Sequence, residues 1–123
     1  MILTNAQIYD YTSALMEEFY DNSLKLPIKM NFYLQKNKKT LFDLAQEIEK
    51  SRLEIASAYG ELNEETQQYQ VPADKVEAAS KDLNELFNIE QDVNIYKINI
   101  DSLSDNFVLT TAQMEAIMFM IED

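Results

Sequence analysis

The sequence lacks cysteine and histidine and contains a single glycine, Gly60. Without cysteine the chain forms no disulfide, binds no metal through thiolates and offers no thiol nucleophile. Histidine supplies most acid–base chemistry at neutral pH, so its absence removes the most common catalytic group. One glycine is too few for a glycine-rich phosphate-binding loop. These absences predict a protein that is not an enzyme and that carries no metal and no cofactor.

Positive charge is also scarce. Ten Lys and Arg residues stand against 22 Asp and Glu residues, which gives a formal net charge of −12. A chain this acidic is repelled by nucleic acid and by anionic membranes. No apolar run approaches the roughly 20 residues that cross a bilayer, and the N-terminal stretch lacks the features of a signal peptide. We therefore expect no direct contact with nucleic acid or membrane, and a cytoplasmic location.

The chain has 123 residues, 46% of them hydrophobic, which suits a single domain, residues 1–123, with one modest core. Its longest pattern runs from Leu26 to Gly60, and Pro27 and Gly60 are placed to begin and end a helix. Between them apolar residues recur at helical spacing: Met30, Leu34, Leu41, Leu44, Ile48, Ile55 and Tyr59. The segment predicts one helix about 50 Å long. Residues 30–34 also have the alternation of a strand.

One polar residue, Asn37, falls on this apolar stripe and predicts a buried amide that is hydrogen-bonded to a neighbouring element. Further helices are predicted over residues 1–22, 73–88 and 110–123. The first and last of these contain capping-box pairs, in which the side chains at the helix start bond each other's backbone N–H groups. The pairs are Thr4 with Gln7 and Thr110 with Gln113.

Residues 93–100 are the most strand-like segment, because they are rich in β-branched side chains. A lone strand leaves its backbone groups unpaired, so residues 69–71 and 107–109 are its predicted partners. Residues 61–70 are acidic and amide-rich and predict an exposed loop. The predicted fold is therefore mainly α (α+β): a long central helix with antiparallel helices packed on it, plus a small antiparallel β element.

Two groups of residues are candidates for partner binding. The stretch from Lys25 to Thr40 contains lysines and no acid, so it is either a solvated basic end or a docking end for acids of another chain. In the last predicted helix two apolar residues widen a core stripe formed by Met114, Ile117, Met118 and Ile121. They are either wedged between two elements or part of a contact surface. The candidate residues are Lys36, Lys38, Lys39, Phe119 and Met120. They predict a protein partner, with a homo-oligomer as one form of it.

Several strings resemble a group of small helical proteins carried by phages and prophages of bacteria. They span most of the chain and include residues 26–29, 36–37, 47–52, 59–60, 83–86 and 114–122. These proteins are mostly of unknown function, so the resemblance implies a source, the cytoplasm of a bacterial host, and no activity.

Three functions are compatible with these features. The first is a noncatalytic phage or prophage accessory protein, an assembly factor or interaction module that binds another protein or itself. The alternative is an acidic inhibitor that mimics nucleic acid and blocks a host or defence enzyme. A third is a hydrolase that uses paired carboxylates, drawn from Glu61, Glu64 and Glu65 or from Glu90 and Asp92.

Overall fold

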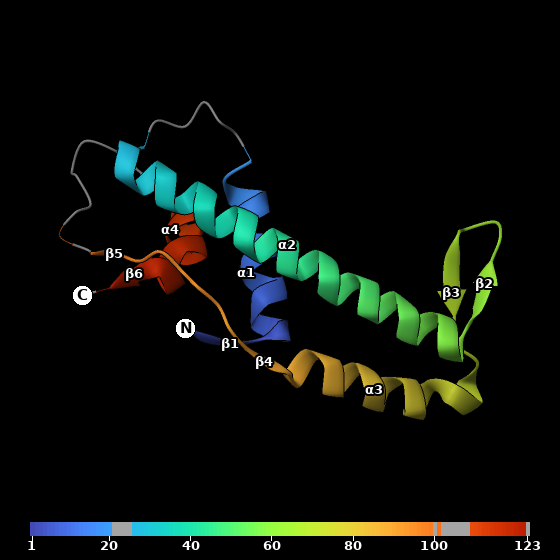
Figure 1. Ribbon diagram of the computed structural model, residues 1–123. Helices are drawn as coiled ribbons and strands as arrows, with labels where there is room; N and C mark the ends of the chain where they lie inside the picture. The colour runs from blue at the N-terminus through green and yellow to red at the C-terminus, as the bar shows by residue number, and fades with distance from the viewer. Residues whose placement is uncertain (21–25, 100, 102–108, 123) are drawn as a thin grey trace.

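A 32-residue helix, α2 (Ile28–Tyr59), runs the length of the computed structural model and organises it (Figure 1). The structure describes residues 1–20, 26–99, 101 and 109–122. Helix α2 includes residues 30–34, so the prediction of a continuous helix is confirmed and the strand alternative is wrong. Four residues of its predicted stripe are buried: Met30, Leu34, Leu41 and Ile48. This stripe is the surface on which the other elements pack.

The two ends of α2 differ from the prediction. Pro27 precedes the first helical residue and does not lie within the first turn. Gly60 has φ −113° and ψ 174°, so it is extended and not left-handed. Glycine is required there for another reason. A Cβ atom would lie 2.8 Å from the carbonyl oxygen of Ala56 and 2.9 Å from that of Gln70, closer than Cβ atoms approach backbone.

The N-terminal helix is shorter than predicted. Strand β1 (Ile2–Thr4) precedes α1 (Asn5–Glu18), because residues 2–4 pair with another strand. The predicted capping box of Thr4 and Gln7 is present at the start of α1. Contacts between α1 and α2 run in opposite order along the chain: Tyr9 bonds Glu49, and the carbonyl of Phe19 accepts from Lys38. Helix α1 therefore packs antiparallel to α2, as predicted.

After α2 the chain forms a hairpin and a third helix. Strands β2 (Glu61–Asn63) and β3 (Gln68–Gln70) pair antiparallel, so the predicted loop over residues 61–70 is an exposed hairpin instead. A 3-10 turn, η1 (Ala73–Lys75), leads into α3 (Val76–Asn88). Helix α3 returns along the second half of α2, where the hydroxyl of Tyr59 donates to Asp82 at 2.6 Å (Figure 1).

The predicted strand over residues 93–100 is wrong in its bounds and in its partners. Strand β4 (Glu90–Asp92) pairs antiparallel with β1, and β5 (Ile98–Asn99) pairs parallel with β6 (Ile121–Glu122). Between β4 and β5 the backbone of Tyr96 bonds the side chain of Asn37 at both its N–H and its carbonyl, each at 2.9 Å. An amide side chain thus takes the place of a partner strand. Of the proposed partners, residues 69 and 70 belong to β3 of the hairpin, and residues 107 and 108 lie outside the described ranges. Val71 and Leu109 are in no strand.

The C-terminal helix is also shorter than predicted. Helix α4 (Thr111–Ile117) begins with the predicted capping box of Thr110 and Gln113. It then tightens into the 3-10 turn η3 (Met118–Met120) and ends in β6. The change of helix type shifts the side chains after Ile117 out of the predicted register. Met118, predicted to be in the core, is therefore 63% exposed, whereas Met120 is 0% exposed.

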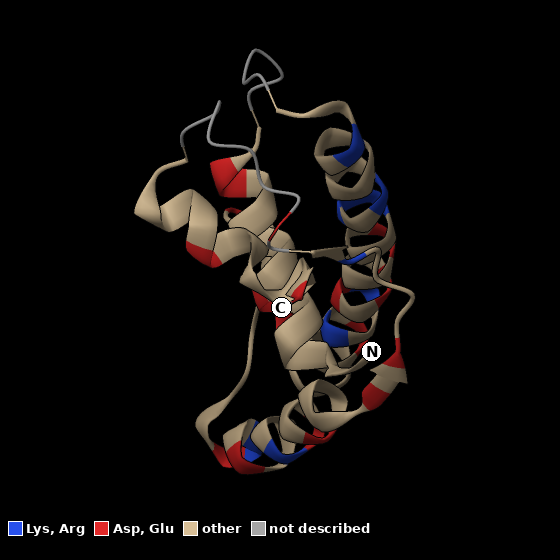
Figure 2. Ribbon diagram, turned by 90° about the vertical axis from the view of Figure 1, so that its left-hand side faces the viewer, with Lys and Arg blue, Asp and Glu red and all other residues tan. Residues whose placement is uncertain are grey.

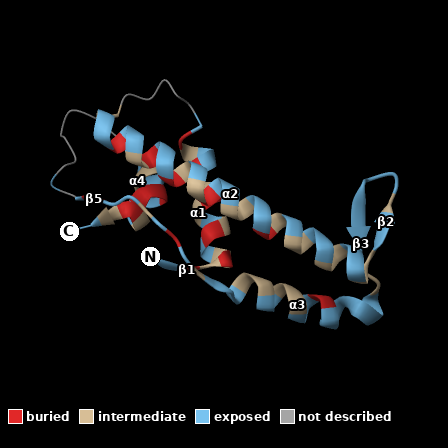
Figure 3. Cartoon of the chain, viewed as in Figure 1, coloured by how far each residue is buried: buried red, intermediate tan, exposed pale blue. Residues whose placement is uncertain are grey.

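Burial is concentrated in one half of the molecule (Figure 3). The core joins α1, the first part of α2, the 93–98 segment and the C-terminal elements. Its fully buried large side chains are Ile8, Leu15, Leu34, Asn37, Leu41, Ile117 and Met120. Between residues 49 and 92 only Ala79 is buried. The hairpin and α3 therefore form a thinly packed second half. It joins the core through α2 and through the end of α3, where the Asn5 side chain donates to the carbonyl of Leu86 and the Tyr9 ring meets that of Phe87 edge-on. The mainly α (α+β) class is confirmed, with two small antiparallel strand pairs and, in addition, the parallel pair of β5 and β6.

Candidate functional site

The two C-terminal candidate residues pack inside the protein. Met120 is fully buried in the core, and Phe119 is partly buried with its ring stacked on Tyr11 at 4.6 Å between centroids. The exposure on which their assignment to a contact surface rested is therefore absent for Met120 and reduced for Phe119. The physical reason is the 3-10 turn η3, which rotates Met120 inward. The remaining candidate residues are the lysines in the first part of α2.

The three candidate lysines differ in what they contact. Lys38 is half-buried, and its ammonium group donates to the carbonyl of Phe19 at 2.9 Å, so it caps the end of α1. Lys36 is exposed, and its Nζ lies 5.4 Å from the centre of the Phe32 ring. Lys39 is exposed and pairs with Asp43 at 3.4 Å, an arrangement that contributes little in water. Lys36 and Lys39 thus remain accessible to a partner, whereas Lys38 mainly holds two helices together.

Beside these lysines lies an apolar row that sequence reasoning missed. Four large side chains on the side of α2 that faces away from its buried stripe are exposed: Ile28 by 90%, Phe32 by 54%, Leu53 by 43% and Phe42 by 38%. Exposed single apolar residues are common on protein surfaces, but a row along one helix face is typical of contact sites. We call these four residues, with Lys36 and Lys39, the outer α2 face.

Charge is distributed unevenly along α2. Its first part carries Lys29, Lys36, Lys38 and Lys39 and no acid, whereas acids predominate from Asp43 onward. Figure 2 shows basic residues in the first part of α2, and acidic residues mixed with basic ones farther along. Because the net charge of the chain is −12, this basic segment differs in sign from the molecule as a whole and attracts carboxylates.

A shallow groove of about 270 Å³ lies along one edge of the outer α2 face. Its apolar walls include Met16 of α1 and Phe42 of α2, and its polar end includes Tyr9 and Glu49. Arg52 donates to the Glu49 carboxylate through Nε at 2.9 Å and through a second guanidinium nitrogen, and the Tyr9 hydroxyl donates to the same carboxylate. These three side chains join α1 to α2.

The hydrogen bonds within this cluster set its protonation. The bonds from Arg52 and then from Tyr9 lower the pKa of Glu49 to about 2, and the bond to Glu49 raises the pKa of Tyr9. Glu49 is therefore ionised at neutral pH and its acceptor positions are engaged. A general acid or base needs a pKa near the working pH, so this cluster is suited to holding helices and not to proton transfer.

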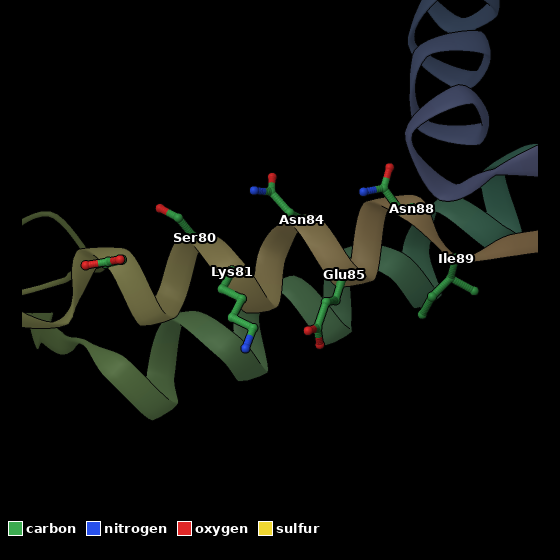
Figure 4. Close-up of a pocket in the computed structure, with 7 residues that line it drawn as sticks. Ser80, Lys81, Asn84, Glu85, Asn88 and Ile89 are labelled. Atoms are coloured by element: carbon green, nitrogen blue, oxygen red, sulfur yellow. The ribbon is translucent and has the colours of Figure 1, made fainter.

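The outward side of α3 presents a different, polar surface (Figure 4). Seven residues from α3 and its end line it: Glu77, Ser80, Lys81, Asn84, Glu85, Asn88 and Ile89. All seven come from one helix and the residue that follows it, so no second element forms an opposing wall. Lys75 and Lys81 alternate with the acids of this segment and interrupt the row of carboxylates that mimicry of nucleic acid requires.

The carboxylates considered for catalysis do not form a site. Glu61, Glu64 and Glu65 are exposed in the hairpin, and Glu90 and Asp92 are exposed on β4. Within the described ranges, no three Asp or Glu side chains gather closely enough to hold a metal ion. Two-carboxylate chemistry needs surroundings that separate the two pKa values, and exposure to water opposes that.

Comparison with family models, with curated proteins and with solved structures finds no match to this chain. The resemblance to phage-encoded proteins therefore stays a prediction. In the part of the chain that the structure describes, no helix is both long and apolar enough to cross a membrane.

Proposed function

We propose that this chain is a noncatalytic accessory protein, of phage or prophage origin as the resemblance implies, that acts by binding protein through the outer α2 face. The observation that carries the proposal is the row of exposed apolar side chains beside accessible lysines. Ile28 has 90% of its surface in water, and burying such side chains in an interface stabilises it. Aromatic residues such as Phe32 are enriched at the centres of interfaces.

The position of the row also supports binding. The side chains from Ile28 to Phe42 lie on the part of α2 whose opposite side packs in the core, so this part of the surface is held in place before a partner binds. A rigid surface loses little conformational entropy when it binds. The lysines beside the row favour a partner that presents carboxylates, and like-charge repulsion disfavours one that presents lysines there.

The test is a comparison of two double variants. The outer-face variant carries Ile28→Ser and Phe32→Ser, and the control carries Val76→Ser and Ile89→Ser, which removes two exposed apolar side chains elsewhere. Both variants should keep the helical circular dichroism of the parent. We expect cross-linking in the producing cells to lose its specific adducts in the outer-face variant only. Equal adducts in both variants would exclude this face.

The phage assignment has a separate test in the neighbouring genes. A position among virion genes would indicate an assembly factor, whereas a position among early or defence genes would indicate an inhibitor. A locus with neither kind of gene would contradict the phage origin and leave the contact function to be judged by the variants.

A further inference from the structure

We infer that the partner of the outer α2 face is a second copy of this chain, whose α2 packs antiparallel against the first. This inference rests on the proposed function and names the partner. It begins with the spacing of the exposed positions. Residues separated alternately by four and three form the seam of a two-helix coiled coil. Eight positions of α2 follow this spacing: Ile28, Phe32, Gln35, Lys39, Phe42, Gln46, Glu49 and Leu53. All are exposed except Glu49, which is intermediate.

The direction of pairing follows from charge. A parallel copy would place the basic first half of α2 against itself, whereas an antiparallel copy places it against the acidic second half. The antiparallel arrangement also sets the positive end of each helix dipole beside the negative end of the other. Lys29, Lys36 and Lys50 lie on the same side of the seam as Asp43, Glu47 and Glu54. In an antiparallel pair that side of one helix faces the same side of the other. From Asp43 onward α2 carries four acids against Lys50 and Arg52, so its second half keeps a net negative charge opposite to that of the first.

The register follows from the apolar residues. Pairing Ile28 with Leu53 of the second copy buries the most exposed apolar side chain of α2 against an apolar partner. The same register sets Lys36 beside Asp43 and Glu47 of the second copy, and it sets Lys29 between Lys50 and Glu54. Phe32 then lies opposite Glu49, whose charge is already paired with Arg52 of its own chain. The register also places Lys39 and Phe42 on either side of the twofold axis. Each contact then occurs twice, and the two copies close on one another without leaving a free binding face.

Contacts within one chain do not supply these pairs. Lys36 and Glu47 are 11 residues apart on α2, about 16 Å along the helix axis, too far for an ion pair. Gln35, Lys39, Gln46 and Glu49 make half of the seam polar or charged. Polar seam residues weaken a coiled coil but specify its register. The dimer is accordingly one of modest affinity and a defined geometry.

Cysteine cross-linking tests the geometry directly, because the chain has no cysteine of its own. Ile28→Cys and Leu53→Cys are made as separate single variants and oxidised alone or mixed. A disulfide needs Cα atoms within about 7 Å. In the antiparallel dimer equal positions lie about 37 Å apart, since 25 residues separate them along the axis. We expect a disulfide dimer in the mixture and not in either variant alone.

The control is a mixture of Ile28→Cys with Ile89→Cys at equal concentration, which reports random collision. A disulfide dimer of Ile28→Cys alone would indicate a parallel pair and overturn the inference. Equal cross-linking in the test and control mixtures would overturn it as well.

A charge exchange tests the register by sedimentation. Lys36→Glu and Glu47→Lys should each raise the dimer dissociation constant about 3- to 10-fold, and the double variant should restore it. Glu47→Lys is the sharper arm, because it lowers the general repulsion between two acidic copies and should still weaken the dimer. Glu77→Lys on α3 makes the same change of net charge away from the seam and should not weaken it. A double variant that is weaker than either single variant would exclude this register.

The outcomes separate the two proposals. If the parent stays monomeric at every concentration while the outer-face variant loses its cellular adducts, the contact function stands and the second-copy partner is wrong. If the outer-face variant changes neither the dimer nor the cellular adducts, the proposed function and the second-copy partner are both wrong.

Discussion

Asn37 is a single polar side chain on which two parts of the core depend. It is fully buried, and it bonds both the N–H and the carbonyl of Tyr96 at 2.9 Å. These bonds attach the segment between β4 and β5 to α2. A buried backbone group that loses its partner carries a cost of about 1–3 kcal/mol. One amide therefore fixes a stretch of chain that no strand partner supports.

We expect Asn37→Ala to lower the free energy of unfolding by about 1–3 kcal/mol, because it leaves the Tyr96 groups without partners. Urea denaturation followed by circular dichroism measures this. The control is Asn84→Ala, which removes an exposed amide on α3 and should change stability by less than about 0.5 kcal/mol. A loss no larger than that of the control would show that water replaces the amide.

Glu49 makes a prediction about pH. Its pKa in the folded protein is about 2, lowered first by Arg52 and then by Tyr9, against an ordinary value of 4.5. A lowered folded pKa adds stability above the unfolded pKa and loses it as the pH falls. Relative to Glu49→Gln, the parent should be more stable at pH 7. This advantage should shrink between about pH 4.5 and 2, in denaturation curves measured at each pH. An advantage that grows on acidification would contradict the pairing.

Single residues were predictable where local chemistry determines them. The sequence correctly predicts Asn37 in the core and both capping boxes at helix starts, because spacing along one helix determines these features. The predicted burial of Met118 and exposure of Met120 are wrong, because the helix changes from α to 3-10 geometry after Ile117, next to the pairing of β6 with β5. Such a pairing joins residues that are distant in sequence.

Gly60 connects two elements, and its constraint is the closeness of backbone atoms. A glycine-to-alanine change at a compatible position usually stabilises a protein, because it lowers the conformational entropy of the unfolded chain. Here the added methyl group would meet the carbonyl oxygens of Ala56 and Gln70. We expect a loss of about 1–3 kcal/mol, the usual cost of overpacking, together with faster hydrogen exchange in β2 and β3. Ser57→Ala, an exposed change one turn earlier in α2, is the control. Stabilisation by Gly60→Ala would show that the hairpin moves aside at no cost.

Elements were predictable in proportion to their length and their caps. Helix α2 was expected over 26–60 and spans Ile28–Tyr59, because a long apolar period outweighs the strand-like alternation of residues 30–34. The strands were not predictable, because each has two or three residues and depends on its partner. Residues 93–97 have the composition of a strand, yet the side chain of Asn37 satisfies part of their backbone.

The unequal distribution of burial implies that the molecule does not open as one unit. Between residues 49 and 92 only Ala79 is buried, whereas the remainder holds the whole core cluster. Regions with few buried contacts open locally at lower free energy. We expect amide exchange in α3 and the hairpin to be at least about 10-fold faster than in α1 and the first half of α2. Mass spectrometry of exchanged peptides measures this. Uniform protection would indicate a single cooperative unit.

The proposed binding surface was only half predictable. The lysines were evident from composition, but the apolar row on the outer α2 face was not. Ile28, Phe32, Phe42 and Leu53 become notable once the stripe opposite them is known to satisfy the core. Without that knowledge they are four apolar residues among many, and the wider apolar stripe of the last helix was the predicted contact surface instead.

Ile117 and Met120, which complete the core, are synthesised well after the helices that they cover. Helix α1 and the first half of α2 are complete once residue 48 has been made, but Ile117 and Met120 follow about 70 residues later. At about 5–20 residues per second, roughly 4–14 s pass before α4 can cover α1. Until then α1 and the first half of α2 expose apolar side chains that α4 and η3 cover in the folded protein. Apolar surface exposed in this way makes an incomplete chain prone to aggregation, the hazard that chaperones limit.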